Sequence, residues 1–460
     1  MRLARWIWLA LYAAGVSARS SSGDRVLVVV PTPGAARDYS DFISSLEARG
    51  FELAVRGAAN ASVVLHGGDG ARLYDHAVLL APESKRLGAL TARSLVRFVD
   101  DGGNLLVTAG SDASPMLRTL AAQFGVTLEK RGSRVVDHVG ASSSGDAGTV
   151  VSARYAHVPA VLSAQLFAAD APPVHFEGVG LRSSDIPQLV PVLSAPRTAY
   201  STAASDDEAP GSALGLVSVF QSRGNARVGV SGSAALFSDR LMRVDGAGNR
   251  QFAADVSQWV LQEKSVLRAS SLRHALATGE RPEHYRVSSD VVFELDLAEF
   301  RKDAWHAYNA DDVQLELTML DPYVRTTLNH THADDSADVT TYRGDVRLPD
   351  RYGTFTFRVN YKRPGLSNVD VRDVVGIRPP RHDEYPRFLT AAYPYYASAL
   401  ALAVGFLGLS AVWLWSAEPK AVVDRKAVTD RKAVTDRKAV AEPKTASEPK
   451  TKRKSKQKSN

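Results

Sequence analysis

The first half of the chain alternates short apolar runs with amphipathic segments. Val26 to Pro31 is a continuous apolar run typical of a buried parallel strand, and Asp41 to Gly50 carries apolar residues at helical spacing before a glycine. The alternation continues with strand patterns at His76–Ala81, Asn104–Gly110 and Asn225–Ser233, and helix patterns at Thr91–Val99, Pro115–Phe124 and Gln251–Leu267. Strands that alternate with helices predict an α/β domain over residues 24–267, with a mostly parallel sheet covered on both faces.

The period of the pattern changes after a polar stretch at Arg268 to Tyr285. Apolar and polar residues now alternate one by one, from Val313 to Met319 and again from Phe355 to Tyr361. A period of two indicates antiparallel strands with one buried face. We therefore expect residues 286–380 to form a small β-rich, sandwich-like domain.

Two longer apolar segments lie near the ends of the chain. Arg2 and Arg5 precede an apolar run from Trp6 to Val16, which is too short to span a bilayer, and small residues follow. This order predicts a signal peptide at residues 1–18, with a buried N-terminal helix as the alternative. Residues 397–417 are almost entirely apolar and would extend roughly 31 Å as a helix, so we expect one transmembrane helix there.

The charge of the last segment gives the expected orientation. Residues 418–460 contain 14 Lys/Arg and six Asp/Glu, and Asp424–Thr429 begins a repeat with a period of six. The positive-inside rule then predicts a type I protein, with residues 19–387 luminal and a disordered or lipid-associated cytosolic tail. Lys456 and Lys458 lie five and three positions from the end, which is the pattern of a dilysine signal for retrieval to the endoplasmic reticulum.

Overall charge and composition exclude several function classes. The net charge of +6 comes from the tail, because residues 19–417 contain 40 Lys/Arg against 44 Asp/Glu. A nucleic-acid-binding protein needs a basic stripe on a folded face, so the charge gives no support to that function. With no cysteine, the chain has no disulfide, no cysteine nucleophile and no cysteine-ligated zinc or iron–sulfur site. We expect no cofactor.

Motifs for catalysis are incomplete. Gly229–Ser233 misses the nucleophile elbow at its fifth position, and Gly178–Gly180 and Gly67–Gly70 lack the remaining residues of nucleotide-binding loops. Each is interpreted as a turn. No Asp-x-Asp pair occurs, so the metal–diphosphate ligands of many sugar-nucleotide glycosyltransferases are missing. Asp137 and His138 allow an acid/base pair, but a structural hydrogen bond is favoured because no nucleophile accompanies them.

A cluster of His330, His332, Asp334 and Asp335 has the residue types of a divalent-metal site. The stretch also contains the glycosylation sequon Asn329-His330-Thr331, so an exposed loop is the favoured interpretation. Asn60 begins a second sequon, Asn60-Ala61-Ser62. Both asparagines, Asn60 and Asn329, are possible glycosylation sites because they lie on the predicted luminal side.

Several stretches together resemble one family, the 48-kDa subunit of the endoplasmic-reticulum oligosaccharyltransferase. They are Arg49–Leu53, Val135–His138, Asn225–Val228 with Ser231–Ser233 and Phe237–Asp239, Asp311–Glu316, Asp321–Thr326 and Ala392–Ala399. The resemblance runs in order from about residue 25 to 417, and the last two motifs are the most specific. The hexapeptide-repeat tail departs from the short tail of the family.

The resemblance implies a non-catalytic subunit, with no catalytic, cofactor or metal residues of its own. The complex transfers a preassembled oligosaccharide from dolichol diphosphate to Asn in Asn-X-Ser/Thr. The implied partners are a catalytic polytopic subunit, ribophorin-type subunits and a small defender-against-death-type membrane subunit. A type I glycan-binding or cargo receptor of the early secretory pathway is the alternative, and a luminal hydrolase would need a nucleophile that the sequence lacks.

The membrane segment supplies candidate docking residues. Lone spanning helices associate through small residues that allow close approach and through a few polar contacts. Small residues recur at spacings of three or four along one face, and three tyrosines stand at the entrance of the segment. The predicted docking residues are Tyr393, Pro394, Tyr395, Tyr396, Ser398, Ala401, Gly405 and Gly408. The alternative is that the tyrosines only mark the headgroup level.

Overall fold

The computed structural model describes residues 20–60, 63–140, 148–168, 170–202, 211–301, 303–330, 338–385 and 387–416. The chain divides into two compact units, Met1–Pro380 and Arg381–Asn460. The predicted signal peptide, the tail with Lys456 and Lys458, and the metal-cluster residues His332, Asp334 and Asp335 lie outside the described residues. Those expectations stay predictions.

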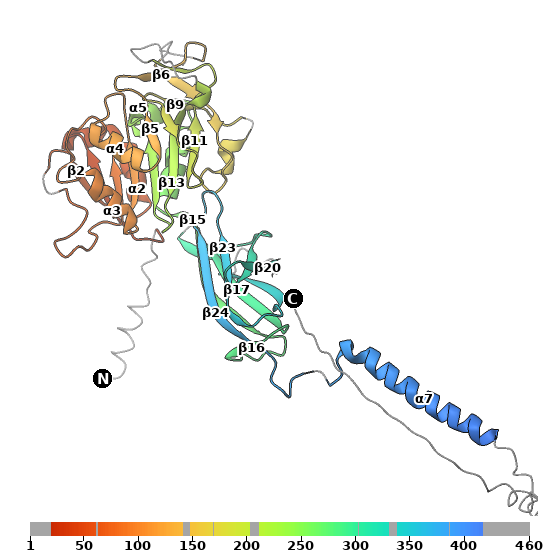
Figure 1. Cartoon of the computed structure of the whole chain (residues 1–460). Helices are drawn as coiled ribbons and strands as arrows, with labels where there is room; N and C mark the ends of the chain where they lie inside the picture. The colour runs from red at the N-terminus through yellow and green to blue at the C-terminus, as the bar shows by residue number, and fades with distance from the viewer. Residues whose placement is uncertain are drawn as a thin grey trace, which may run out of the picture. The chain divides into compact units, whose positions relative to one another are not determined.

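A ten-stranded mixed sheet forms the centre of the first part of the large unit (Figure 1). Five strands are parallel in the order β2-β1-β3-β4-β14: β2 (Glu52–Gly57), β1 (Arg25–Val30), β3 (His76–Leu79), β4 (Asn104–Thr108) and β14 (Arg227–Ser231). The other five pair antiparallel: β13 (Gly215–Gln221), β10 (Leu181–Ser183), β5 (Val126–Leu128), β11 (Leu189–Ser194) and β8 (Arg154–Tyr155). The expectation of a parallel sheet therefore holds for half of it. A tight hairpin joins β13 to β14 and requires them to run in opposite directions.

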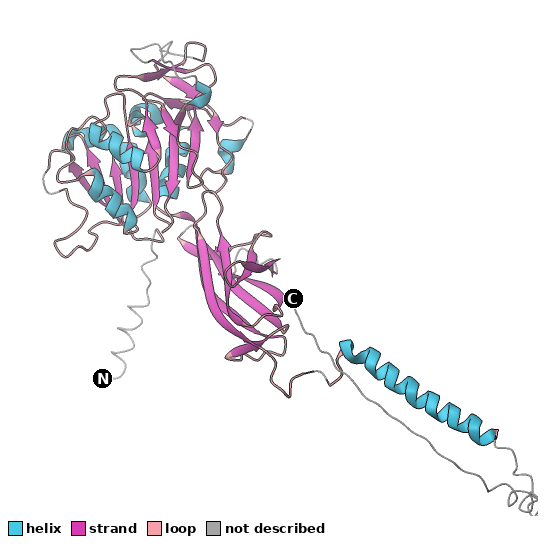
Figure 2. Ribbon diagram, viewed as in Figure 1, coloured by secondary structure: helices cyan, strands magenta, loops and turns pink. Residues whose placement is uncertain are grey.

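Helices cover both faces of this sheet, as Figure 2 shows. Val28 of β1 belongs to the core that includes residues of α2 (Ser40–Ala48) and α6 (Asn249–Val260). Its neighbour Leu27 belongs to the opposite core, with residues of α3 (Ala92–Asp100) and α4 (Pro115–Gln123). Successive residues of a strand point to opposite faces, so the continuous apolar run of β1 is explained by burial on both sides.

Smaller elements complete this part. They are the one-turn helix α5 (Asp239–Met242), two antiparallel pairs, β6 (Arg134–Val136) with β12 (Tyr200–Thr202) and β7 (Val150–Ser152) with β9 (Val174–Phe176), and four short 3-10 helices, η1 (Pro33–Tyr39), η2 (Ala164–Phe167), η3 (Gly211–Ala213) and η4 (Ala235–Phe237).

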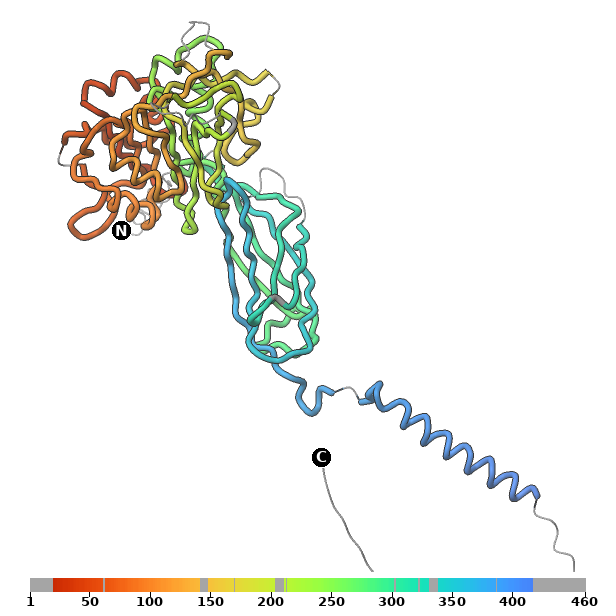
Figure 3. Tube along the Cα trace, turned by 45° about the horizontal axis from the view of Figure 1, so that its top comes forward, coloured from red at the N-terminus to blue at the C-terminus, as the bar shows by residue number. Residues whose placement is uncertain are grey.

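Two five-stranded sheets follow and share one apolar core, to which alternate residues of their strands contribute. The first contains β15 (Lys264–Leu276), β17 (Asp290–Arg301), β18 (Ala304–Ala307), β21 (Asn329–His330) and β22 (Thr340–Arg347). The second contains β16 (His284–Arg286), β19 (Gln314–Thr318), β20 (Pro322–Thr327), β23 (Gly353–Tyr361) and β24 (Val369–Arg378). Figure 3 shows these long strands running side by side. The predicted alternation at 313–319 and 355–361 corresponds to β19 and β23.

The helix predicted to extend to Leu267 ends earlier, at Val260. Gln262 and Ser265 have φ values of 59° and 60°, in the left-handed region that a right-handed helix cannot pass through. The chain then enters β15, which pairs with β17. The first half of the stretch interpreted as a polar connection is therefore a strand of the second part, and the division at 267 and 286 stays a prediction.

The small unit contains one long helix, α7 (Tyr393–Trp415). Within the described residues, the segment Thr390–Trp415 is the one helical stretch that is long and apolar enough to cross a membrane. It begins four residues before the predicted Ala397, and Pro394 is compatible with this start because it lies in the first turn, where the N–H that proline lacks has no partner within the helix.

Candidate functional site

Asp137 has a structural role in a loop. Its Oδ1 accepts hydrogen bonds from the backbone N–H groups of Val139 and Gly140, both 3.0 Å away, and its Oδ2 accepts one from the Thr198 hydroxyl at 2.7 Å. Burial raises the pKa of this carboxyl, but these donors outweigh burial and hold it below its ordinary value. The His138 ring instead lies 5.9 Å from the ring of Tyr200. The interactions of Asp137 are those of a buried loop anchor.

The glycine-rich stretch at the end of β14 packs closely against the backbone of Gly178 and Val179. A Cβ on Gly232 would lie 2.0 Å from the carbonyl oxygen of Val179, and one on Gly178 would lie 2.2 Å from the carbonyl oxygen of Gly232. The Val179 N–H donates to that Gly232 oxygen at 2.9 Å. Ser231 is buried and its hydroxyl donates to the Ser233 carbonyl at 2.9 Å. Glycine is required here for packing, as expected of a turn.

The predicted sequon residues and the metal cluster are only partly described. Asn60 and Asn329 are exposed, while the Ser62 and Thr331 that complete their sequons lie outside the described residues. His330 Nε2 lies 3.3 Å from Asp311 Oδ1, and its ring lies 4.9 Å from that of Tyr342. In the part of the chain that the structure describes, no group of three His, Asp or Glu residues is placed to hold a metal.

The predicted docking residues all lie on α7 or in its first turn. No residue of this helix is buried, and the Ser398 hydroxyl donates to the Tyr395 carbonyl at 2.8 Å. A Cβ built on Gly405 or Gly408 would meet nothing within 4 Å. This face therefore has space for contact with another molecule.

An unexpected feature is a buried arginine where the α/β part meets the β-rich part. Arg227, in β14, is 0% exposed and donates to the carbonyl oxygens of Trp259, Lys264 and Ser265 at 2.9, 2.7 and 2.6 Å. Its guanidinium also lies 4.6 Å from the centre of the Trp259 ring. Burial lowers the pKa of Arg227 to about 9, so it remains charged at neutral pH.

A loop of the β-rich part packs into the same junction. The Trp259 indole N–H donates to the Gly365 carbonyl at 2.7 Å, and the Gln221 amide donates to the Leu366 carbonyl at 2.9 Å. Asn225 both donates to the Asn368 carbonyl at 3.0 Å and accepts from its N–H at 2.7 Å. These bonds fix the loop between β23 and β24 against the β13–β14 hairpin and α6.

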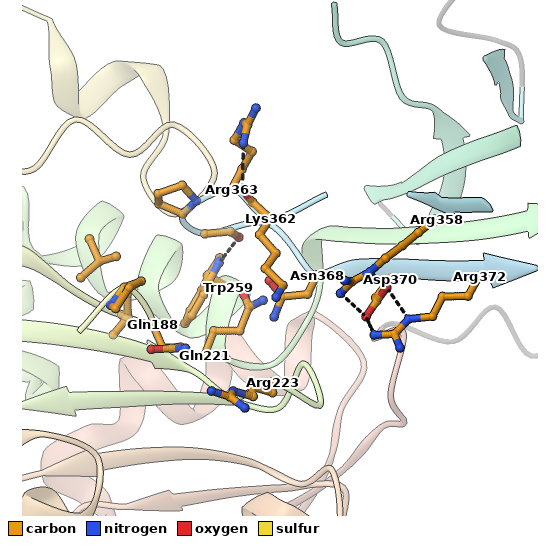
Figure 4. A pocket seen from close by; sticks show the side chains of 15 residues that line it. Gln188, Gln221, Arg223, Trp259, Arg358, Lys362, Arg363, Asn368, Asp370 and Arg372 are labelled. Carbon is orange, nitrogen blue, oxygen red and sulfur yellow. Dashed lines mark hydrogen bonds and ion pairs between the residues drawn. The ribbon is translucent and has the colours of Figure 1, made fainter. Parts of the chain in front are cut away.

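Beside this junction is a groove of about 650 Å³ (Figure 4). It is lined by five cationic side chains and one carboxylate, which are Arg223, Arg358, Lys362, Arg363, Arg372 and Asp370. Their elements are the β13–β14 hairpin, β23, the loop after it, and β24. Neither Arg227 nor this groove was found from sequence. The one sequence signal for the burial of Arg227 is its position inside the mostly apolar run Asn225–Val230. That signal does not reveal which groups accept the hydrogen bonds of the arginine.

Comparison with known proteins gives consistent matches along the chain. The family model described as "OST48, N-terminal domain" matches residues 17–263, and "OST48 middle domain" matches residues 273–417. A Caenorhabditis elegans protein named "Dolichyl-diphosphooligosaccharide--protein glycosyltransferase 48 kDa subunit" is 34% identical over 89% of this chain and 96% of its own. An Arabidopsis thaliana protein of the same name is 33% identical, over 88% and 96%. The Schizosaccharomyces pombe "subunit wbp1" of that glycosyltransferase is 35% identical, over 84% and 91%.

Proposed function

Because the chain belongs to the family of the 48-kDa subunit of dolichyl-diphosphooligosaccharide–protein glycosyltransferase, we propose that it serves protein N-glycosylation as a non-catalytic subunit of that complex. The observation that carries the proposal is the extent of the similarity, which includes the α/β part and the β-rich part and reaches the apolar helix. The relatives are named as subunits of a glycosyltransferase, and the complex as a whole performs the transfer of oligosaccharide to Asn in Asn-X-Ser/Thr.

The non-catalytic role is supported by the interactions of the polar residues first considered for catalysis. Asp137 accepts three hydrogen bonds from its own loop and from Thr198. Ser231 is buried beside a backbone contact that leaves no space for even a methyl group on Gly232. Both side chains therefore serve the fold, and the chemistry is assigned to another subunit.

We further infer a type I arrangement in the endoplasmic-reticulum membrane. The α/β domain and a β-sandwich would lie in the lumen, α7 would cross the bilayer, and the basic tail with Lys456 and Lys458 would be cytosolic. Residues 24–267, 286–380 and 397–417 remain our proposed divisions. Protease added to intact microsomes should remove only the tail, and digestion of the luminal part would contradict this orientation.

We propose that the partners are a catalytic polytopic subunit, ribophorin-type subunits and a small defender-against-death-type membrane subunit. The exposed face of α7 with Ser398, Ala401, Gly405 and Gly408 supports contact within the membrane. The glycan-binding or cargo receptor is not favoured, because the similarity covers nearly the full length of oligosaccharyltransferase subunits.

A replacement experiment tests the non-catalytic role. Asp137→Asn and Ser231→Ala variants should lower glycosylation of a reporter only as far as they lower the amount of assembled complex. The measurement compares the mobility shift of the reporter with the quantity of complex recovered. A variant with normal assembly and abolished transfer would overturn the proposal.

A further inference from the structure

The groove beside the domain junction has a strong excess of positive charge. Asp370 pairs with two of its cations, since Arg358 and Arg372 donate to its oxygens at 3.0 and 2.6 Å. Arg372 and Arg358 together hold the pKa of Asp370 well below its ordinary range, so this carboxylate is ionised at neutral pH. One negative charge between two arginines still leaves a positive surface.

Two of the three remaining cations increase this excess, and the third is paired with a carboxylate. Arg363 donates to Asp312 at 2.6 Å, outside the groove lining. Arg223 and Lys362 are exposed and form no ion pair with any residue that the structure describes. Free cations at the two rims of one groove repel each other and favour an anionic occupant.

The cationic surface is long as well as charged. Arg358 lies in β23 and Lys362 directly follows that strand, so the two are four positions apart. At about 3.3 Å per residue, this is roughly 13 Å of groove wall. A single phosphate group is too small to contact such a length, whereas an extended peptide of about four residues matches it. The lining is also more polar than the mostly apolar cavities that take drug-like molecules.

The two walls are held in place before any ligand arrives. The loop from Lys362 to Asn368 is fixed by the bonds of Trp259, Gln221 and Asn225, which come from the other part of the chain. Figure 4 shows Trp259 and Gln221 between Arg223 on one side and Lys362 on the other. A ligand would therefore lose little free energy in ordering the groove.

We propose that this groove binds an acidic, extended peptide segment of another polypeptide. The Arg223 guanidinium can hold a carboxylate with two parallel hydrogen bonds, and the Lys362 ammonium would pair with the next acidic side chain as a point charge. The inference rests on the proposed role as a subunit only in assigning the segment to a partner in the same complex. The chemistry of the groove stands without that assignment.

The test measures peptide binding to the full chain in mild detergent. The probe is a fluorescein-labelled peptide of eight glutamates, followed by fluorescence anisotropy, with a peptide of eight glutamines as the uncharged comparison. The glutamate peptide should bind and the glutamine peptide should not. Arg223→Glu with Lys362→Glu should raise the Kd about tenfold or more, because two attractive contacts become repulsive.

A matched control distinguishes binding in the groove from non-specific attraction to the positive charge of the protein. Arg286→Glu with Arg347→Glu makes the same charge change at exposed residues of the β-rich part that do not line the groove. It should change the Kd less than twofold. Equal weakening by both double variants, or full displacement of the peptide by millimolar inorganic phosphate, would overturn the inference. Such a result leaves the proposed function intact, since that is tested by co-purification with other subunits.

Discussion

The junction around Arg227 and the helix α7 differ in what they bury and what they expose: the junction buries a charged side chain, and the helix exposes an apolar surface. Arg227 buries a charge inside the large unit, and four groups of the same chain accept hydrogen bonds from it: the carbonyls of Trp259, Lys264 and Ser265 and the Ser367 hydroxyl. In α7 the surface is apolar, and no residue of the helix is buried.

The difference shows which part of the protein finds its interaction partners within the same chain. A buried cation is tolerated only when fixed acceptors replace its water, and here the chain supplies them. An exposed apolar helix is tolerated only in lipid or against other helices, and the described chain supplies neither. The large unit is therefore expected to fold from its own contacts, and α7 to depend on the membrane and on partners.

Removing Arg227 should give the largest effect. In Arg227→Ala three carbonyls and the Ser367 hydroxyl each lose one donor and Trp259 loses its cation, so the free energy of unfolding should fall by about 3–5 kcal/mol. Urea denaturation of the detergent-solubilised chain measures this change. Arg223→Ala, at an exposed position four residues earlier, is the control and should change the unfolding free energy by less than about 0.5 kcal/mol. Equal stability of the two variants would mean that the junction does not depend on Arg227.

His76 gives a pH dependence of intermediate size. Its ring is fully buried, with Nε2 2.8 Å from the Gly23 carbonyl and Nδ1 3.1 Å from the Asn104 amide, and burial lowers its pKa to about 4. As pH falls below 6.5 the unfolded chain binds a proton that the folded imidazole does not, so stability is lost between about pH 6.5 and 4.

The expected size of this loss is about 3 kcal/mol, from a pKa difference of about 2.5. Unfolding free energies measured across this range should fall less steeply in His76→Gln, whose side chain does not titrate. Identical pH slopes for the two proteins would contradict the buried neutral histidine.

Changes in α7 should have the smallest effect on stability and a clear effect on assembly. A Cβ at Gly405 or Gly408 meets nothing within 4 Å and both positions lie outside the large unit, so replacing both by Leu should change the unfolding free energy of that unit by less than about 0.5 kcal/mol. The more apolar helix should still insert, but its partners could no longer approach closely. Co-purification of the other subunits should decrease, and reporter glycosylation with it. Undiminished co-purification would exclude docking through this face.

The same contrast explains what sequence could predict. The strand β1 was found because burial on both faces leaves a continuous apolar run in the sequence. The strands β19 and β23 were found because burial on one face leaves a strict alternation of apolar and polar residues. The spanning helix was found from length and apolarity. The antiparallel β13 was missed because strand direction depends on pairing partners, and its own run of apolar residues fits either direction.

Arg227 and the groove could not be predicted, because their contacts join distant parts of the chain. The acceptors of Arg227 lie 32 to 140 positions further along the sequence. Arg223 and Lys362 come together only when the loop after β23 packs on the β13–β14 hairpin. The prediction that a helix reaches Leu267 was wrong for a local reason, because the backbone is left-handed at Gln262 and Ser265.

Affinity purification of the tagged full-length chain in mild detergent tests the central claim most directly. The account predicts that a multi-span subunit and other membrane subunits come with it, and that the purified assembly transfers oligosaccharide from a dolichol diphosphate donor to an Asn-X-Ser/Thr peptide. The same chain separated from its partners should transfer none. Recovery of the chain without partners, or transfer by the isolated chain, would contradict the claim that it is a non-catalytic subunit.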